Sequence, residues 1–189
     1  MGVCLIVALA LAWRSELDYY LHLATGQMGL IVGCESVAQV LASPALENRT
    51  RERLLFSGAI LEFAHKELGL GGASNYTCYY DTDGQPVSWN ISASPPHRFA
   101  PYQWWFPIVG SVPYKGYFDR ERAEAAADEL REDGEFEVCV SAVTAYSTLG
   151  WMNDPVTRPM LTRGAASLVE TLFHELVHAT AFLPGDADF

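Results

Sequence analysis

Positive charge is scarce in this sequence. Its 189 residues include 12 Lys and Arg against 23 Asp and Glu, so the formal net charge is −11 at pH 7 with neutral histidines. Nucleic-acid backbones and anionic membrane surfaces also carry negative charge, and they repel such a chain. We therefore expect no nucleic-acid partner.

Closely spaced cysteines are also lacking. The four cysteines, Cys4, Cys34, Cys78 and Cys139, form no CxxC pair, which excludes a zinc ribbon and a dense disulfide scaffold. A Cys78–Cys139 disulfide is one pairing that the spacing allows. The cysteine count alone leaves the redox compartment open.

The sequence has no hydrophobic run long enough to span a membrane. Val3–Trp13 is an apolar run of 11 residues that ends at Arg14, whereas a spanning helix needs about 20. Its length suits the core of a signal peptide, although no Lys or Arg precedes it, and a buried helix is the alternative. We interpret residues 1–18 as the remnant of an export signal or anchor. This predicts a cell-envelope or periplasmic location, with membrane association through the N-terminus.

The remaining composition suits a folded domain. Hydrophobic residues make up 50% of the chain and charged residues 19%, so a sizeable core can form, and the length predicts one domain. Apolar positions at helical spacing predict helices in residues 17–46, with a break at Gly29–Gly33, and from Asn48, the expected N-cap, to Leu70. The N-terminal part is therefore expected to be helical.

The middle of the chain is rich in β-branched and aromatic residues. The predicted strands cover residues 76–80, 87–93, 102–106, 108–112 and 136–143. A turn-forming stretch joins the first two, which predicts a hairpin, and Asp119 is the expected N-cap of a helix over residues 120–133. The pattern predicts an α+β fold with a small, mostly antiparallel sheet.

An HExxH motif occupies residues 174–178 and is rare by chance in a chain with five histidines. Apolar residues flank it, with Gly164 before and Pro184 after, which predicts a helix over about residues 165–182. On a helix, His174 and His178 lie on one face with their Cβ atoms about 5–6 Å apart, a spacing that lets both imidazoles bind one tetrahedral Zn²⁺. The alternative is a pair of ordinary polar residues on an amphipathic helix.

The spacing also gives Glu175 a role. It lies about 100° around the helix from the first histidine, close enough to reach a metal-activated water without binding the metal. As general base it would take a proton from the water and pass it to the leaving amine. Catalytic zinc needs a third protein ligand. No histidine follows His178, and Pro184-Gly185 turns the chain away before Asp186 and Asp188.

Several longer stretches carry a resemblance to a known family. They are Tyr19–Gln27, Phe63–Leu70, Trp89-Asn90, Phe106–Phe118, Ala145–Trp151 with Asp154-Pro155, and His174–Thr180. In this order they resemble the putative bacterial aminopeptidase family, HExxH zinc peptidases that are often exported or lipid-anchored. The resemblance implies a gluzincin-like metallopeptidase, of which residues 19–189 form a partial domain. It also implies that the third ligand, a glutamate of an Asn-Glu motif, lies beyond Phe189, and the lipid-attachment cysteine of many relatives is absent before Tyr19.

The strand expected at residues 136–143 leads towards Tyr146. In zinc peptidases of this general architecture, an edge strand upstream of the metal helix pairs with extended substrate backbone. We expect this strand to bind the substrate and Tyr146 to line the cleft, and the alternative is that Tyr146 and Trp151 pack as core aromatics. Lys115 could hold a substrate carboxylate, although a lysine in a turn is usually solvated.

These observations lead to a main hypothesis and an alternative. The main hypothesis is a zinc-dependent peptidase, by resemblance an aminopeptidase, with His174 and His178 as Zn²⁺ ligands, Glu175 as general base and a peptide as substrate. The alternative is a non-catalytic or truncated envelope protein with a structural or partial zinc site. The sequence leaves the oligomeric state open.

Overall fold

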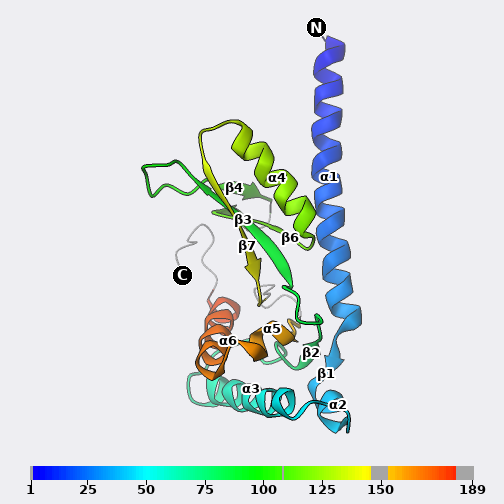
Figure 1. Ribbon diagram of the computed structural model, residues 1–189, viewed down its shortest axis with the longest axis vertical. Coiled ribbons are helices and arrows are strands. Elements are labelled where there is room, and N and C mark those ends of the chain that lie inside the picture. Colours follow the sequence, from blue (N-terminus) through cyan, green and yellow to red (C-terminus); the bar gives the residue numbers. More distant parts are fainter. Residues whose placement is uncertain (1, 108, 146–152, 182–189) are drawn as a thin grey trace.

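The computed structural model describes residues 2–107, 109–145 and 153–181, with side chains from residue 14 onward. In chain order the elements are α1 (Gly2–Gly33), β1 (Glu35–Ser36), α2 (Val37–Ala42), α3 (Asn48–Lys66), β2 (Cys78–Tyr80), β3 (Ser88–Ser94), β4 (Trp104–Phe106), β5 (Gly110–Val112), β6 (Lys115–Tyr117), α4 (Arg120–Glu132), β7 (Glu137–Val143), β8 (Val156–Thr157), α5 (Arg158–Thr162) and α6 (Ala165–Thr180). Helices and short strands are mixed along the chain, so the predicted α+β class is confirmed (Figure 1).

The strands form three small sheets. Their orders are β1-β2-β8, β6-β3-β7 and β4-β5. Among the described strands, β2 and β8 form the one parallel pair, and every other pair is antiparallel. The mostly antiparallel arrangement that the sequence predicts is therefore confirmed.

The predicted hairpin of residues 76–80 and 87–93 is wrong, because β2 and β3 belong to different sheets. The backbone N–H of Tyr76 donates to the carbonyl oxygen of Asp154 at 2.7 Å, which holds this part of the chain beside β8. After β2, Asp83 and Gly84 have positive φ values of 53° and 80°. This turn redirects the chain to the second sheet instead of folding it back on β2.

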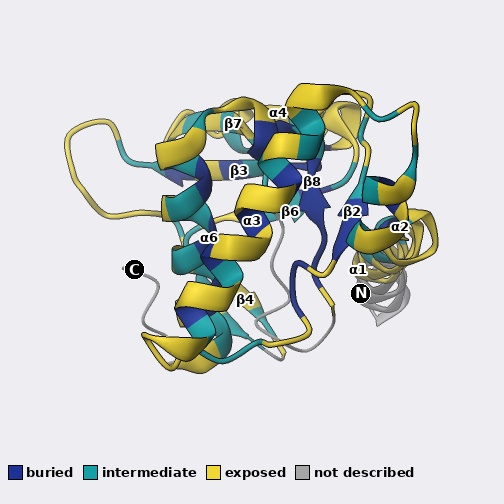
Figure 2. Cartoon of the chain, turned by 90° about the horizontal axis from the view of Figure 1, so that it is seen from below, coloured by how far each residue is buried: buried dark blue, intermediate teal, exposed yellow. Residues whose placement is uncertain are grey.

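A first core lies between α3, α5 and α6. Leu168, Leu172 and Leu176 recur every four residues and form the buried stripe of α6, each with 0% exposure (Figure 2). They pack with Leu54 and Ala64 of α3. Burial of one leucine side chain contributes roughly 1.5–3 kcal/mol. This stripe fixes which face of α6 points towards the core.

The ends of α3 differ from the predicted helix. Its N-cap is Glu47 rather than Asn48. Near the other end, Gly69 has a positive φ of 66°, and the N–H of Leu70 donates back to the carbonyl oxygen of Ala64 at 3.0 Å. This reversal ends the helix before the predicted end at Leu70.

A second core lies between α4 and the sheet β6-β3-β7. Ala123 and Ala127 of α4 are 0% exposed, and their small side chains let the helix approach Ile91 of β3 closely. Asp119 is the N-cap of α4 as predicted, and its carboxylate accepts the N–H of Arg122 at 2.9 Å. The predicted helix over residues 120–133 is confirmed to within one residue.

The long helix α1 packs against this second core. The hydroxyl of Tyr19 donates to the carbonyl oxygen of Gly116 at 3.1 Å, and the N–H of Phe118 donates to Nε2 of His22 at 3.0 Å. A Cβ atom on Gly26 would lie 2.0 Å from the Phe118 ring, so only a glycine allows this close approach. The middle of α1 is thus fastened to β6 and the residue that follows it.

Nε2 of His22 accepts this hydrogen bond, so the imidazole is neutral at this contact. Burial lowers the pKa of His22 most, and the positive charge of Arg122 lowers it further. The carboxylates of Asp119 and Asp18 oppose the shift. The pKa remains below the usual histidine value, which favours the neutral form that accepts the hydrogen bond.

The predicted helix break at Gly29–Gly33 is wrong, because α1 continues to Gly33. Of the two glycines in this part of the helix, Gly33 lies in a close packing contact and Gly29 does not. A Cβ on Gly33 would lie 2.4 Å from the Tyr80 ring of β2. Helix packing therefore explains Gly33, which the sequence pattern attributes to a break.

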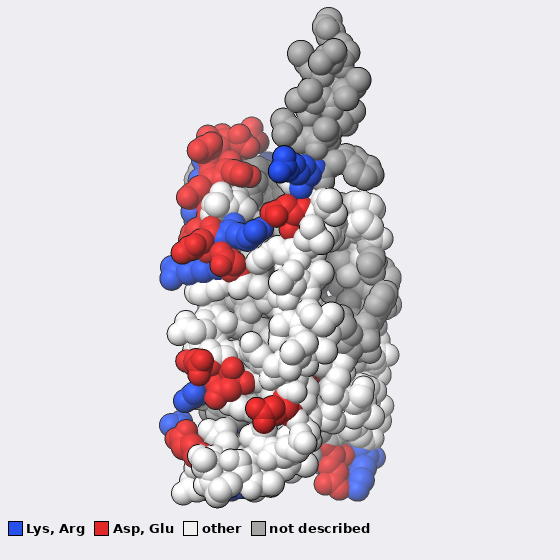
Figure 3. All heavy atoms as spheres, turned by 90° about the vertical axis from the view of Figure 1, so that its right-hand side faces the viewer, with Lys and Arg blue, Asp and Glu red and all other residues white. Residues whose placement is uncertain are grey.

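The opposite face of α1 is apolar and exposed. Leu17, Leu21, Met28 and Val32 are 60%, 57%, 57% and 77% exposed. Figure 3 shows that the side of the molecule that carries α1 is largely uncharged. Within the described residues, no helix is both long enough and apolar enough to cross a bilayer.

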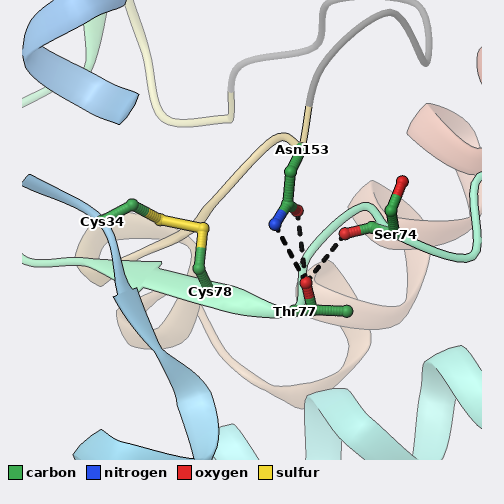
Figure 4. The surroundings of a disulfide bond; sticks show 5 residues. All are labelled: Cys34, Ser74, Thr77, Cys78 and Asn153. Carbon is green, nitrogen blue, oxygen red and sulfur yellow. Dashed lines mark hydrogen bonds between the residues drawn. A yellow bond between two sulfur atoms is a disulfide. The ribbon is translucent and has the colours of Figure 1, made fainter. Parts of the chain in front are cut away.

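One disulfide joins Cys34 to Cys78, with a Cα–Cα distance of 5.8 Å (Figure 4). The alternative pairing of Cys78 with Cys139 is wrong, because Cys139 is free and exposed on β7. Antiparallel pairing of β1 with β2 places Ser36 opposite Cys78 and so brings Cys34 within reach. β7 lies in the other sheet, away from this pair.

Candidate active site

The helix α6 carries the HExxH motif. It begins after Gly164, whose φ is 114°, and the described helix ends at Thr180, in agreement with the predicted span from residue 165. Because the leucine stripe, which includes Leu176 of the motif, faces the first core, the two histidines lie on the other side of the helix. His174 is exposed, and Glu175 and His178 are half-buried.

The two histidines of the motif face each other. Their Nε2 atoms are 3.0 Å apart, and their ring centroids are 4.6 Å apart with nearly perpendicular planes. Burial lowers the pKa of His178, and the neighbouring His174 lowers it further. Both effects favour the neutral imidazole, the form that binds metal ions.

This arrangement fits two of the ligands of a zinc site. Two nitrogens that share one tetrahedral Zn²⁺ at about 2.0–2.1 Å lie about 3.3 Å apart, close to the observed separation of His174 and His178. In the described part of the chain, no set of three His, Cys, Asp or Glu side chains is placed to hold a metal ion. Asp186 and Asp188 lie outside the described residues.

A pocket of about 330 Å³ lies beside the motif. Its lining consists of Ala142, Val143, Thr144 and Ala145 on one side and of Glu170, Thr171, His174 and Glu175 on the other. One wall is therefore the end of β7 and the residues that follow it, and the other wall is α6. The pocket brings the first histidine and the glutamate of the motif opposite the strand that the sequence predicts to bind substrate.

The β7 wall is an edge strand. Its sheet has the order β6-β3-β7, and no other described strand pairs with the outer side of β7. The hydroxyl of Thr157 donates to the carbonyl oxygen of Thr144 at 2.6 Å and fastens the end of this strand to β8. β8 leads directly into α5, which packs against α6, so the same contact fixes both walls.

Sequence reasoning missed two side chains near the motif. Glu170 lines the pocket, and its position four residues before His174 is a helical-spacing signal that could have identified it. Tyr114, between β5 and β6, lies close enough for the negative charge of Glu175 to raise the pKa of its phenol, in addition to the larger effect of burial. Nothing in the local sequence identifies Tyr114.

Lys115 lies away from the pocket, and two aromatic residues considered in the sequence analysis are outside the described part of the chain. Tyr146, predicted to line the cleft, and Trp151 fall outside the described residues. The ammonium group of Lys115 lies 4.3 Å from the ring centroid of Tyr19 on α1, in a cation–π contact. Lys115 therefore contacts the α1 side of the sheet rather than the pocket.

Comparison with known proteins gives one match. A family model described as "Putative aminopeptidase" matches residues 18–189. The chain belongs to this putative aminopeptidase family. No curated protein and no solved structure matches it. The matched range of this aminopeptidase family includes both walls of the pocket and the whole HExxH motif.

Proposed function

We propose that this protein is a zinc-dependent peptidase, and specifically an aminopeptidase, with Glu175 as its general base. The observation that carries the proposal is the pocket itself. It places His174 and Glu175 of α6 opposite the edge strand β7, with Nε2 of His178 3.0 Å from Nε2 of His174. The aminopeptidase family to which the chain belongs supports the peptidase activity.

In this proposal, His174 and His178 hold the metal ion, and a third ligand is supplied from beyond the described residues. Zinc, when bound, lowers the pKa of a water molecule and polarises the scissile carbonyl group. Glu175 accepts the proton of that water and later transfers it to the leaving amine. The neutral side chains of the Ala142–Ala145 wall make this part of the pocket suitable for the uncharged peptide backbone.

The substrate in this proposal is a peptide that lies along β7. An edge strand offers unpaired backbone N–H and C=O groups, and an extended peptide can add to it as a further strand. Tyr146 is proposed to line the same cleft, because it follows the pocket wall by one residue in the sequence. Kinetics unchanged in Tyr146→Phe would contradict this role.

We further propose a cell-envelope or periplasmic location with membrane association through α1. The Cys34–Cys78 disulfide supports it, because disulfides persist in oxidising compartments and are rare in the cytosol. The exposed apolar residues of α1 and the apolar run before Arg14 support the association. Lys and Arg are few in the chain, so we expect apolar contact rather than charge to provide the affinity.

The test of the main proposal is the substitution Glu175→Gln. We expect the variant to retain its bound zinc, measured by elemental analysis after dialysis, and to lose turnover of an L-leucine anilide by roughly 10²–10⁴-fold. Glu132→Gln, an exposed position on α4 away from the pocket, is the matched control and should hydrolyse the substrate normally. Retained turnover in Glu175→Gln would refute the assignment of the general base.

The alternative function is a non-catalytic envelope protein with a partial or structural zinc site. The presence of only two candidate ligands among the described residues favours it. A site with two ligands binds zinc more weakly than a site with three, because each ligand adds to the affinity. Equilibrium dialysis against zinc distinguishes the two: weak binding without hydrolysis supports the alternative.

A further inference from the structure

Glu170 is a carboxylate in the pocket that the proposed hydrolysis does not use. It lies one helical turn before His174 on α6 and lines the same pocket. Its side chain forms no hydrogen bond or ion pair with any residue in the described part of the chain. Glu170 is exposed, so a ligand in the pocket can reach its oxygens.

The charged side chains that line the pocket are all acidic. Its eight lining residues include the two carboxylates Glu170 and Glu175 and no Lys or Arg. A site with this charge favours a cationic group and disfavours a free carboxylate. Because Glu175 faces the proposed reacting water, Glu170 is the carboxylate that remains for substrate recognition.

We propose that Glu170 binds the free α-ammonium group of the peptide and so restricts the substrate to unblocked amino termini. This inference rests on the proposed peptidase function and specifies its substrate class. An ammonium–carboxylate pair is a charge-assisted hydrogen bond, which is stronger than a neutral one. The proposal assigns the amino-terminal selectivity to one side chain.

The spacing on α6 agrees with removal of one residue at a time. Side chains four residues apart on a helix have Cβ atoms about 5–6 Å apart. In a peptide, the α-nitrogen lies about 2.5 Å from the carbonyl carbon of the same residue. An ammonium group bound by Glu170 therefore places the first peptide bond of the substrate beside His174 and Glu175.

The experiment measures binding, not turnover. The zinc-free protein is titrated at pH 6.5 with L-leucinamide, N-acetyl-L-leucinamide and N-acetyl-L-argininamide, and binding is followed by NMR. At this pH the α-amino group of the first probe is mostly protonated. The same titrations are made with Glu170→Gln and with the control Glu132→Gln, whose carboxylate is exposed on α4.

We expect L-leucinamide to bind about tenfold more tightly than its acetylated form. Glu170→Gln should remove this difference, and Glu132→Gln should keep it. The proposal would be overturned if the two leucine probes bind equally, or if neither binds. It would also be overturned if the arginine probe binds most tightly, because that result would indicate a pocket for basic side chains.

Because no step of this test requires hydrolysis, its result is separate from that of Glu175→Gln. If the unsubstituted protein hydrolyses peptides but shows no leucinamide preference, or if Glu170→Gln keeps the preference, only the role of Glu170 is refuted. A preserved preference in a protein without turnover would refute only the peptidase function.

Discussion

The Cys34–Cys78 disulfide is expected to make a large contribution to stability. It fastens the end of α1 and strand β1 to β2, in the sheet that also holds β8. The perturbation is the double substitution Cys34→Ser, Cys78→Ser. It removes the covalent link while serine, similar in size to cysteine, limits the change in packing at the largely buried Cys78.

The expected magnitude follows from the length of chain that the link closes. The two cysteines are 44 residues apart in sequence. Loss of such a loop closure in the unfolded state corresponds to about 4 kcal/mol in the chain-entropy account of disulfides. For a domain of this size, each kcal/mol shifts Tm by about 2–4 °C, so we expect the variant to melt about 8–16 °C lower.

The assay is thermal unfolding followed by circular dichroism, with and without a thiol reductant. The reductant should lower the Tm of the unsubstituted protein to that of the double variant and should leave the double variant unchanged. Cys139→Ser is the control, because Cys139 is free and exposed, and it should melt like the unsubstituted protein. If Cys139→Ser lowers the Tm as much as the double substitution does, the pairing of Cys34 with Cys78 is refuted.

Two further predictions concern the contact between α1 and Phe118. Gly26→Ala should destabilise the protein by about 1–3 kcal/mol in urea denaturation, because its Cβ would overlap the Phe118 ring. Gly29→Ala, with no atom within 4 Å of the added Cβ, should instead stabilise it by about 0.5–1 kcal/mol. Folding lowers the pKa of His22 below the unfolded value of about 6.5. The contribution of His22 to the free energy of unfolding should therefore be complete above about pH 6.5 and should decrease as the pH falls below this value. His22→Gln can still accept the Phe118 N–H and should lose this part of the pH dependence, and an unchanged pH profile would contradict the assignment.

Elements with strong local signals could be predicted from the sequence. The leucine stripe of α6 recurs at helical spacing, and Asp119 begins a run of good helix formers, so both helices lie where the pattern places them. Local hydrogen bonds and amphipathic spacing specify such helices within one window of the chain. Distant segments of the chain contribute little to where these two helices begin.

Pairings between distant segments could not be predicted in this way. β2 pairs with β8, which lies more than 70 residues later, and the local turn after β2 gave the incorrect hairpin. The same difficulty applies to Cys78, whose partner Cys34 is brought near by β1 rather than by sequence spacing. The close approach of Gly26 to Phe118 likewise depends on tertiary packing, which a glycine count does not distinguish from a helix break.

The candidate site likewise combines a local element, which could be predicted, with a contribution from a distant segment, which could not. The motif on α6 is local, so its helix and the facing histidines could be predicted before the fold was known. The opposite wall of the pocket comes from β7, and its position depends on the sheet. Glu170 shares the periodicity of the motif, whereas Tyr114 approaches Glu175 only through the fold.

The position of the pocket makes its shape depend on both cores. α6 is anchored in the first core, while Val138 and Val140 of β7 pack against the second. The chain crosses from one core to the other at the pocket wall, since Ala145 already packs against the first core. α1 spans the same junction, with Tyr19 in the second core and its last turn beside Tyr80 of β2. Because the disulfide fixes that last turn to β2, its loss should loosen the junction as well as lower Tm, and the leucinamide titration of the double variant would measure the effect on the pocket.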